Sequence, residues 1–364
     1  MKIATVTFHR AANYGAVLQA YALQQAIKLR NPDCEVGVLD HCNEVIEKRY
    51  KPFYLKGKKG AKSLVRAFAT VPMRYKKRKA FRAFVNGRLN LIPFSSDEEK
   101  KQALKSVDRF VAGSDQIWNF DLSGWDKTYL LDFVDDNSQK YAYAPSIGKT
   151  QLNEKEKSTL KSLNTFAGIS AREESAAQLI CDVTQKKPEI VPDPVFLLDK
   201  EDWRKIEKKP ADDIPQKYVL IYRFIVKADD GNRIMQFAKQ YAEKYGCKIV
   251  MLQDTLKKFN GVNVIKSVAP DEFVWLIDHA QCVVTNSFHG TAFSVLFGKQ
   301  FFSEANVVRG TRIKEILSLY GLEDHLLTEN KKASELDTDW DKVNAKVSQY
   351  RAGAFEYIDS IISD

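Results

Sequence analysis

The amino-acid sequence predicts an α/β protein with two domains, each built on a parallel β-sheet. Its length of 364 residues is enough for two hydrophobic cores. Apolar runs of strand length alternate with runs of helical periodicity along most of the chain, which is typical of parallel strands joined by helices. A polar segment rich in proline and charge, residues 207–215, interrupts this alternation and indicates a domain boundary.

The first domain is expected over residues 1–205, with a basic helical insertion at about 48–96. Its strands are expected, in order, at 2–8, 36–40, 109–112, 141–144, 166–170 and 190–191. These are short apolar runs rich in β-branched and aromatic residues, as in buried strands. Helices are expected at 16–29, within the basic insertion, where Phe81 and Phe84 share one face, and from about Arg172 to about Cys181.

The second domain is expected over residues 216–335, where the same alternation restarts. Strands are expected at 218–225, 248–252, 262–265 and 282–285, and helices at 231–245, 271–279 and 291–297. The remaining residues, 336–364, are expected to form a helix at roughly 340–362 that packs back across both domains. Its apolar residues recur at helical spacing: Val343, Val347, Tyr350, Phe355, Ile358 and Ile361.

The composition is that of an ordinary folded protein, with 44% hydrophobic and 28% charged residues. No apolar run approaches the roughly 20 residues of a membrane-spanning helix. The N-terminus enters a strand without the layout of a signal peptide, so a cytoplasmic location is expected. The five cysteines are scattered and include no CxxC pair, which favours reduced thiols and argues against a zinc site.

Positive charge is concentrated in one stretch of the chain. The net charge is +9, yet residues 48–94 contain no acidic residue and fifteen Lys and Arg, so the remainder carries 9 − 15 = −6. These cations are Lys48, Arg49, Lys51, Lys56, Lys58, Lys59, Lys62, Arg66, Arg74, Lys76, Lys77, Arg78, Lys79, Arg82 and Arg88. Two interpretations stay open: peripheral contact with an anionic membrane, or a solvated helical face. Nucleic acid is not expected, because the rest of the chain is negative.

Several cofactor classes lack support in the sequence. There is no GxGxxG and no Walker A motif, so neither a dinucleotide nor ATP is expected. The five histidines show no metal-ligand spacing, so no metal is expected.

Candidate site residues in the first domain follow its strands. Asn13, Tyr14 and Gly15 stand at the first strand-to-helix turn, where a helix start can hold an anion or a sugar hydroxyl; alternatively Asn13 simply caps the helix. Asp115 and Gln116 follow the strand 109–112, and short polar residues at such a position line clefts more often than cores.

The alternative for this stretch is a capped turn. Trp118 is expected in the core, although Trp118 and Trp125 are also candidates for stacking on a sugar ring.

Arg172 is expected to open a helix after the strand 166–170. A positive charge at a helix start interacts unfavourably with the helix dipole, so an arginine at this position is better explained by a bound anion than by helix stability. The alternative is a surface arginine paired with Glu173 and Glu174. The sequence leaves both open.

The corresponding candidate in the second domain is His289. It stands between the strand 282–285 and the helix 291–297, where α/β proteins place ligands. The alternative is a core histidine satisfied by backbone groups. Arg309 and Arg312 follow in a glycine-containing segment expected to be a loop, and two such arginines suit a carboxylate or a phosphate.

Six stretches together carry a family resemblance: "TFHRAANYGAVLQAYALQQAI", "AGSDQIWN", "YAPSIG", "SAREESAAQLI", "VPDPVFLL" and "TNSFHGTAFSVLFGKQF". In this order they resemble the polysaccharide pyruvyl transferase family. The resemblance implies two Rossmann-like domains facing a cleft, as in type B glycosyltransferases. It implies an enzyme that transfers pyruvate from phosphoenolpyruvate (PEP) to a sugar as a ketal, in making capsule or surface polysaccharide.

The resemblance also implies site residues. Arg172 and His289 would be catalytic and would face one cleft. Substrate-binding residues on the matching motifs would be Asn13, Tyr14, Gly15, Gln19, Asp115, Gln116, Ser146, Ser287, Gly290, Arg309 and Arg312. Other branches of the family carry Arg-Leu-His where this chain has Ser287-Phe288-His289, so the role of that arginine would pass to Arg309 or Arg312, or be absent.

The implied partners are PEP as donor substrate and a sugar or lipid-linked oligosaccharide as acceptor, with no cofactor and no metal. The expected location is the cytoplasm, with the inner face of the membrane as the site of any lipid contact. Two other functions stay open. One is a glycosyltransferase that uses a nucleotide sugar on the same frame, and the other is a non-catalytic sugar-binding protein.

Overall fold

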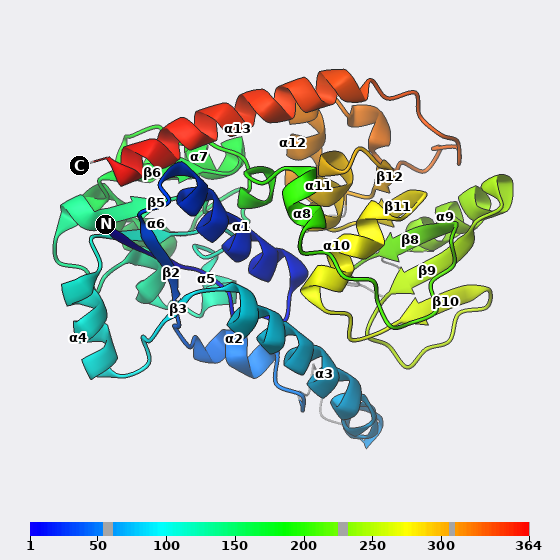
Figure 1. Cartoon of the computed structure of the whole chain (residues 1–364), viewed down its shortest axis with the longest axis horizontal. Coiled ribbons are helices and arrows are strands. Elements are labelled where there is room, and N and C mark those ends of the chain that lie inside the picture. The colour runs from blue at the N-terminus through cyan, green and yellow to red at the C-terminus, as the bar shows by residue number, and fades with distance from the viewer. Residues whose placement is uncertain (54–60, 225–231, 306–309, 364) are drawn as a thin grey trace. The chain divides into compact units, whose positions relative to one another are not determined.

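The structure is a computed structural model that describes residues 1–53, 61–224, 232–305 and 310–363 (Figure 1). Its strands form two parallel sheets, which confirms the predicted α/β class. The chain divides into two compact units. Unit 1 comprises Met1–Tyr50, Arg82–Leu198 and Ser348–Asp364, and unit 2 comprises Lys51–Phe81 and Asp199–Val347.

Unit 1 contains a seven-stranded sheet within the described residues, in the order β3-β2-β1-β4-β5-β6-β7. Its strands are β1 Lys2–Val6, β2 Glu35–Leu39, β3 Leu91–Ile92, β4 Arg109–Ala112, β5 Lys140–Ala142, β6 Gly168–Ala171 and β7 Glu189–Ile190. The strand order reverses at β1, which pairs with both β2 and β4, so that later strands are added on its other side. This is the Rossmann order, and the switch point lies between β1 and β4.

The helices of unit 1 cover both faces of this sheet. They are α1 Tyr14–Arg30, α2 Glu44–Arg49, α4 Asp97–Ser106, α5 Phe120–Ser123, α6 Glu154–Leu160 and α7 Glu174–Thr184, with short 3-10 turns at Lys127–Leu130, Asn137–Gln139, Lys161–Thr165 and Pro194–Phe196. Side chains alternate across β1: Ile3 packs in one core with Ile358, and Ala4 packs in another with Phe110. A sheet buried on both faces accounts for the nearly continuous apolar runs of its strands.

Unit 2 contains a smaller parallel sheet, in the order β10-β9-β8-β11-β12 among the described residues. The strands are β8 Tyr218–Tyr222, β9 Lys248–Leu252, β10 Val262–Ile265, β11 Cys282–Thr285 and β12 Gln300–Ser303. The helices are α8 Lys200–Arg204, α9 Asn232–Tyr245, α10 Pro270–Asp278, α11 Phe288–Leu296 and α12 Gly310–Tyr320, with a 3-10 turn at Glu323–His325. Here the switch point lies between β8 and β11.

Two long helices are divided between the units. In α3, Ala61–Arg88, residues up to Phe81 belong to unit 2 and the rest to unit 1. In α13, Trp340–Ile362, the division falls at Ser348. The helix predicted in the basic insertion is present as α3, and Phe81 and Phe84, expected on one of its faces, are both buried. No helix in the described part of the chain is long and apolar enough to cross a bilayer.

Several elements differ from the sequence prediction, among them two strands and the helix α12. The two-residue strand β3 and the strand β12 were not expected, because β3 is too short to show a period and only Gly298 and Lys299 separate the apolar end of the helix α11 from β12. The segment containing Arg312 was expected to be a loop but forms α12 from Gly310 onward. Ile313, Ile316, Leu317 and Tyr320 recur at helical spacing and are buried, which stabilises the helix.

Candidate functional site

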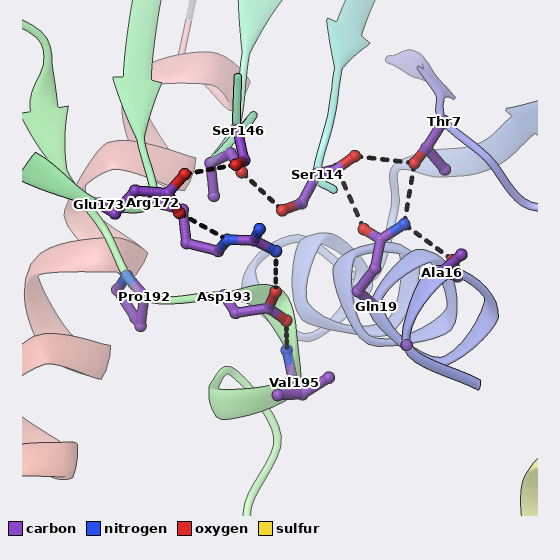
Figure 2. Close-up of polar contacts among 12 residues, drawn as sticks. Thr7, Ala16, Gln19, Ser114, Ser146, Arg172, Glu173, Pro192, Asp193 and Val195 are labelled. Atoms are coloured by element: carbon purple, nitrogen blue, oxygen red, sulfur yellow. Dashed lines mark hydrogen bonds and ion pairs between the residues drawn. The ribbon is translucent and has the colours of Figure 1, made fainter. Parts of the chain in front are cut away.

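The predicted site residues of unit 1 lie where its strands end, around the switch point between β1 and β4. Figure 2 shows the polar contacts there. Gln19 on α1 is fully buried, and its amide nitrogen donates to Thr7 Oγ1 and to the carbonyl of Ala16, both at 2.8 Å. Its amide oxygen accepts from the Ser114 backbone at 3.0 Å. Gln19 therefore ties the ends of β1 and β4 to the first turns of α1.

The start of α1 is held by Asn13. The Asn13 side chain accepts hydrogen bonds from the backbone N–H groups of Gly15 at 3.0 Å and Ala16 at 3.5 Å. It is the N-cap of α1, and Tyr14 and Gly15 form the buried first turn. The capping role allowed by the sequence is thus present, and a substrate role for these three residues stays a prediction.

Asp115 is presented by a sharp turn after β4. A Cβ at Gly113, whose φ is +131°, would lie 2.1 Å from the carbonyl oxygen of Tyr143, so glycine is needed at this position. Asp115 has a φ of 70°, and its carbonyl accepts from the backbone of Ser146 at 2.9 Å. The neighbouring Gln116 side chain packs over Gly148, where an added Cβ would lie 2.2 Å from its Oε1.

Arg172 does not open a helix. Strand β6 continues to Ala171, and α7 begins at Glu174 with Glu173 as its N-cap, so Arg172 lies in the connection between them. Its guanidinium donates to Glu173 at 3.0 Å and to Asp193 at 2.6 Å. The alternative of a surface arginine is wrong, because the side chain is 1% exposed, but the pairing with Glu173 that it included is present.

Carboxylates outnumber cations around Arg172. Burial lowers the pKa of Arg172, but the charges of Glu173, Asp193 and Asp115 outweigh burial and raise it above its ordinary value. Ser146 donates a short hydrogen bond to Glu173, and Asp193 also accepts from the backbone of Val195 at 3.1 Å (Figure 2). This edge of unit 1 thus holds three carboxylates around one buried guanidinium.

Asp115 differs from the other two carboxylates. Within the residues that the structure describes, no hydrogen bond reaches its side chain, whereas Glu173 and Asp193 each accept from Arg172. Asp115 is 9% exposed. Its carboxylate therefore remains available to a hydroxyl group.

In unit 2, His289 lies at the switch point between β8 and β11. Ser287 caps α11 by accepting from the backbone of Gly290 at 3.3 Å, which makes His289 the second residue of the helix. The helix thus begins three residues earlier than predicted, because the cap starts it. His289 is 8% exposed, and its ring stands at 84° to that of Phe288.

Gly290 is required by the packing of this turn. A Cβ there would lie 2.5 Å from Thr285 Oγ1, which itself donates to the carbonyl of Tyr222 at 2.5 Å and accepts from the backbone of Ser287 at 3.0 Å. The turn that carries His289 is therefore bonded to β8. Asn286 reinforces this by exchanging two hydrogen bonds with the backbone of Phe224, at 2.7 and 2.9 Å.

Two arginines accompany His289 at this edge. Arg223 follows β8 directly, next to Asn286 across the strand pair, and is 9% exposed. Burial lowers the pKa of Arg223, and the charge of Glu304 after β12 opposes that effect. Arg312 on α12 is also 9% exposed and lies over the ring of Phe288 at 5.9 Å. Arg309 lies outside the described residues.

Sequence reasoning missed Asp193, Arg223 and Glu304. Asp193 was signalled by its place between two prolines after a short strand. Arg223 was hidden because the predicted strand ran through it to residue 225, although a charged residue directly after "YVLIY" is itself a sign of a strand end. The prediction that Arg172 and His289 face one cleft concerns both units together and stays a prediction.

One group of potential metal ligands occurs among the described residues. The ligand atoms of Glu207, Asp278 and His279 lie within 4.8 Å of one another. Arg204 already donates to both carboxylate oxygens of Asp278, at 2.7 and 3.1 Å, so a guanidinium occupies the place that a cation would take. This group is better explained as an ion-pair cluster.

The aromatic candidates near Asp115 are packed on protein. Trp118 is 1% exposed and donates to the carbonyl of Tyr129 at 2.9 Å, so its predicted place in the core is confirmed. Trp125 stacks on Phe120 with the rings 8° apart and 4.5 Å between centroids. Lys155 lies 3.9 Å from the centre of the Trp125 ring.

The fold and these sites define an α/β protein with two Rossmann-like sheets and polar residues at both switch points. The chain belongs to the polysaccharide pyruvyl transferase family, whose model matches residues 13–306. The family resemblance seen in the sequence is thus confirmed, and the protein is an enzyme of this family. Its family implies a pyruvate donor and a polysaccharide acceptor.

Solved structures resemble the chain only distantly. UDP-GlcNAc 2-epimerase from Methanocaldococcus jannaschii, in complex with UDP-GlcNAc and UDP, has 11% identity and a TM-score of 0.48, with 100% of this chain and 99% of that chain covered. E. coli heptosyltransferase WaaC with ADP has 12% identity and a TM-score of 0.43, with 97% and 100% covered. No curated protein sequence matches the chain.

Proposed function

We propose that the enzyme transfers pyruvate from PEP to a sugar of a surface or capsular polysaccharide unit, forming a ketal. In this proposal unit 2 binds PEP and unit 1 binds the sugar. The observation that carries it is the contrast between two buried arginines. Arg172 is surrounded by carboxylates that raise its pKa, whereas burial lowers the pKa of Arg223. Glu173 and Asp193 already accept from Arg172. Unit 2 instead brings two buried cations, Arg223 and Arg312, to the segment around the start of α11, and an anion would interact favourably with both.

Unit 2 offers what PEP requires. PEP carries a carboxylate and a phosphate, and Arg223 and Arg312 are cations suited to both. The start of α11 adds backbone N–H groups and the positive end of a helix dipole. His289 lies in the first turn of this helix, and an imidazole can carry a proton near neutral pH.

The reaction then balances as follows. His289 donates a proton to the PEP methylene carbon, which becomes the methyl group. One sugar hydroxyl oxygen bonds to C2, the bond between C2 and the phosphate oxygen breaks, and a second hydroxyl oxygen bonds to C2. One hydroxyl proton restores His289, and the other leaves with phosphate. No electrons are exchanged with a cofactor.

Unit 1 offers carboxylates that can bind the hydroxyl groups of a sugar. Its three carboxylates repel an anion but accept hydrogen bonds from a sugar. Asp115 is the proposed base: it takes up the hydroxyl proton that then leaves with phosphate, and so ends the reaction as a carboxylate. Arg172 acts through Glu173 and Asp193, whose positions it fixes.

The donor assignment is tested by binding. PEP is expected to raise the melting temperature of the wild type, while Arg223→Ala and Arg312→Ala weaken PEP binding tenfold or more. Asp115→Asn is the matched control and keeps wild-type PEP affinity. Stabilisation by a nucleotide sugar instead of PEP would establish the glycosyltransferase alternative. Stabilisation by neither would favour a non-catalytic sugar-binding protein.

The proton donor is tested by turnover. His289→Ala is expected to keep the fold and PEP binding but to lose phosphate release from PEP with a panel of oligosaccharide acceptors. The reason is that Thr285, Asn286 and Ser287 hold this turn through their own hydrogen bonds, whereas the methylene carbon needs a proton. Near-normal phosphate release by this variant would show that His289 is structural.

The proposed setting is the cytoplasm, with a sugar or a lipid-linked oligosaccharide as acceptor and no cofactor. Polysaccharide repeating units are assembled on lipid carriers at the inner face of the membrane in many biosynthetic routes, and a pyruvyl transferase of this kind would act there. The acceptor assignment is checked by the product, because a ketal adds the mass of pyruvate less one water to the sugar.

A further inference from the structure

The first half of α3 leaves large apolar side chains in solvent. Among the described residues, Leu64, Val65, Phe68 and Tyr75 are 44%, 69%, 60% and 62% exposed. Phe53, which precedes the helix, is 42% exposed and packs its ring 4.9 Å from that of Phe68. An exposed cluster of large apolar side chains is typical of a surface that binds a protein or a membrane.

These side chains share one face of the helix with two lysines. At 100° per residue, the exposed residues Leu64, Val65, Phe68, Tyr75, Lys76 and Lys79 fall within a sector of roughly 120°. This sector is here called the exposed face of α3. Apolar residues occupy its N-terminal part and lysines its C-terminal part.

The other side of the helix is bound to unit 2. Lys77 forms an ion pair with Asp254 at 2.7 Å, and Ser267 donates to the carbonyl of Met73 at 2.7 Å. Ala67 is buried. The helix is therefore fixed on its inner side, which leaves the exposed face directed to solvent.

The aromatics of α3 follow two different patterns. Phe81 and Phe84 are 3% and 6% exposed. This is the burial expected where a helix directs its charged residues to solvent and packs its aromatic residues on the rest of the protein. Phe68 and Tyr75 are not covered in this way. Simple solvation of charged residues explains the second half of α3 and leaves the first half unexplained.

The charge of this stretch points to the nature of the partner. Residues 48–94 contain fifteen cations and no acidic residue, and this excess of positive charge favours binding to an anionic surface. Nucleic acid would satisfy the cations but gains little from exposed Val65 and Phe68. A bilayer with anionic headgroups satisfies both, because apolar side chains enter the headgroup boundary while lysines stay at the phosphates.

We infer that the exposed face of α3 docks on an anionic lipid bilayer surface. The apolar residues insert at the level of the headgroups, and Lys76 and Lys79 contact lipid phosphates. This inference concerns where the enzyme works and does not rest on the proposed reaction, so its test requires neither PEP nor an acceptor.

The test is co-sedimentation of the full chain with vesicles of phosphatidylcholine alone or mixed with phosphatidylglycerol. Wild type is expected to bind the mixed vesicles at least tenfold more tightly at low salt, and high salt should weaken this binding. Lys76→Glu/Lys79→Glu is expected to weaken it tenfold or more, since each basic residue near such a surface contributes about 1 kcal/mol. Val65→Ser/Phe68→Ser is expected to weaken it without changing the charge.

Two variants elsewhere serve as controls. Lys186→Glu/Lys187→Glu makes the same charge change at exposed residues, and Leu29→Ser removes an apolar side chain that is 60% exposed. Both are expected to bind as wild type does. Circular dichroism confirms that each variant is folded.

Two results would overturn the inference. One is wild type that stays in the supernatant with mixed vesicles at low salt. The other is binding that does not depend on the apolar residues: either the Val65→Ser/Phe68→Ser variant sediments as wild type does, or wild type and this variant each bind RNA as tightly as vesicles. Either outcome of the second kind would identify non-specific binding of polyanions through the lysines.

Discussion

Asp115 shows how the backbone can set the role of a single side chain. Three carboxylates surround Arg172, but Glu173 and Asp193 each accept from its guanidinium, and among the described residues the Asp115 carboxylate accepts from none. The turn around Gly113 holds Asp115 at a positive φ, next to these partners. The pairing leaves Asp115 as the carboxylate that can take a proton from a sugar hydroxyl.

We therefore expect Asp115→Asn to lower kcat by a factor of about 10² to 10⁴, the usual contribution of a general base. Asparagine has nearly the same shape and tolerates a positive φ, so the fold and the KM for PEP should stay unchanged. Phosphate release with an oligosaccharide acceptor measures this. Asp135→Asn, at an exposed aspartate, is the control. A wild-type kcat in the Asp115 variant would assign the base elsewhere.

The residues differ in how far the sequence could reveal them. Asp115 and His289 follow clear strands, so the alternation of apolar and polar runs located both at sheet edges. The surroundings of Arg172 could not be found in this way, because its partner Asp193 lies 21 positions further along the chain. Local patterns report the position of a strand end but not which distant carboxylate meets it.

At the scale of single elements, the start of α11 carries the candidate site of unit 2. Gly290 lets the helix approach Thr285 closely, and Thr285 bonds both Tyr222 and Ser287. The sequence showed that a helix begins near His289, but its first residue depended on the Ser287 cap. The first residue of α7 could not be predicted for the same reason, because the charged residues Arg172 and Glu173 before the helix gave no sign of where it begins.

We expect Gly290→Ala to destabilise unit 2 and to displace the turn that carries His289. The added Cβ would lie 2.5 Å from Thr285 Oγ1, so the Thr285 bonds must shift. Gly353→Ala is the matched control, because Gly353 lies inside α13 with nothing within 4 Å of an added Cβ. That change should stabilise its helix by roughly 0.5–1 kcal/mol. Urea unfolding measures both, and an equal effect of the two substitutions would contradict the packing argument.

At the scale of the whole molecule, the existence of two parallel sheets could be inferred better than the ends of their strands. Alternating runs predicted two parallel sheets, and both have the Rossmann order. The sequence led to the expectation that the C-terminal helix packs across both domains, but it did not predict that α3 is divided between the two units. Contact between segments far apart in the chain decides such a division, and local periodicity carries no information about it.

His325 links three segments of unit 2 and makes its stability depend on pH. Nδ1 lies 2.9 Å from the carbonyl of Phe301 on β12, and Nε2 lies 2.9 Å from Thr338 Oγ1, just before α13. The ring also stacks on Phe301 at 4.1 Å. Burial lowers the pKa of His325 to about 4 from its ordinary value of 6.5.

The sign of the effect follows from this lowered pKa. Well above pH 6.5 the imidazole is neutral in both the folded and the unfolded chain, so it makes no difference to the free energy of unfolding. As the pH falls from 6.5 towards 4, the unfolded chain takes up the proton and the folded chain does not. The folded state is therefore destabilised on the acid side, by about 2 kcal/mol between pH 7 and pH 5.

We expect His325→Gln to remove this part of the pH dependence. Its stability at pH 7 will be lower than that of the wild type, because the ring stacking is lost, so the informative quantity is each protein's own difference between pH 7 and pH 5. Urea unfolding at both pH values measures that difference. It should be smaller by about 2 kcal/mol in His325→Gln. His279→Gln, at an exposed histidine, should behave as wild type does. An unchanged difference in His325→Gln would mean that the imidazole is protonated in the folded enzyme as readily as in the unfolded chain.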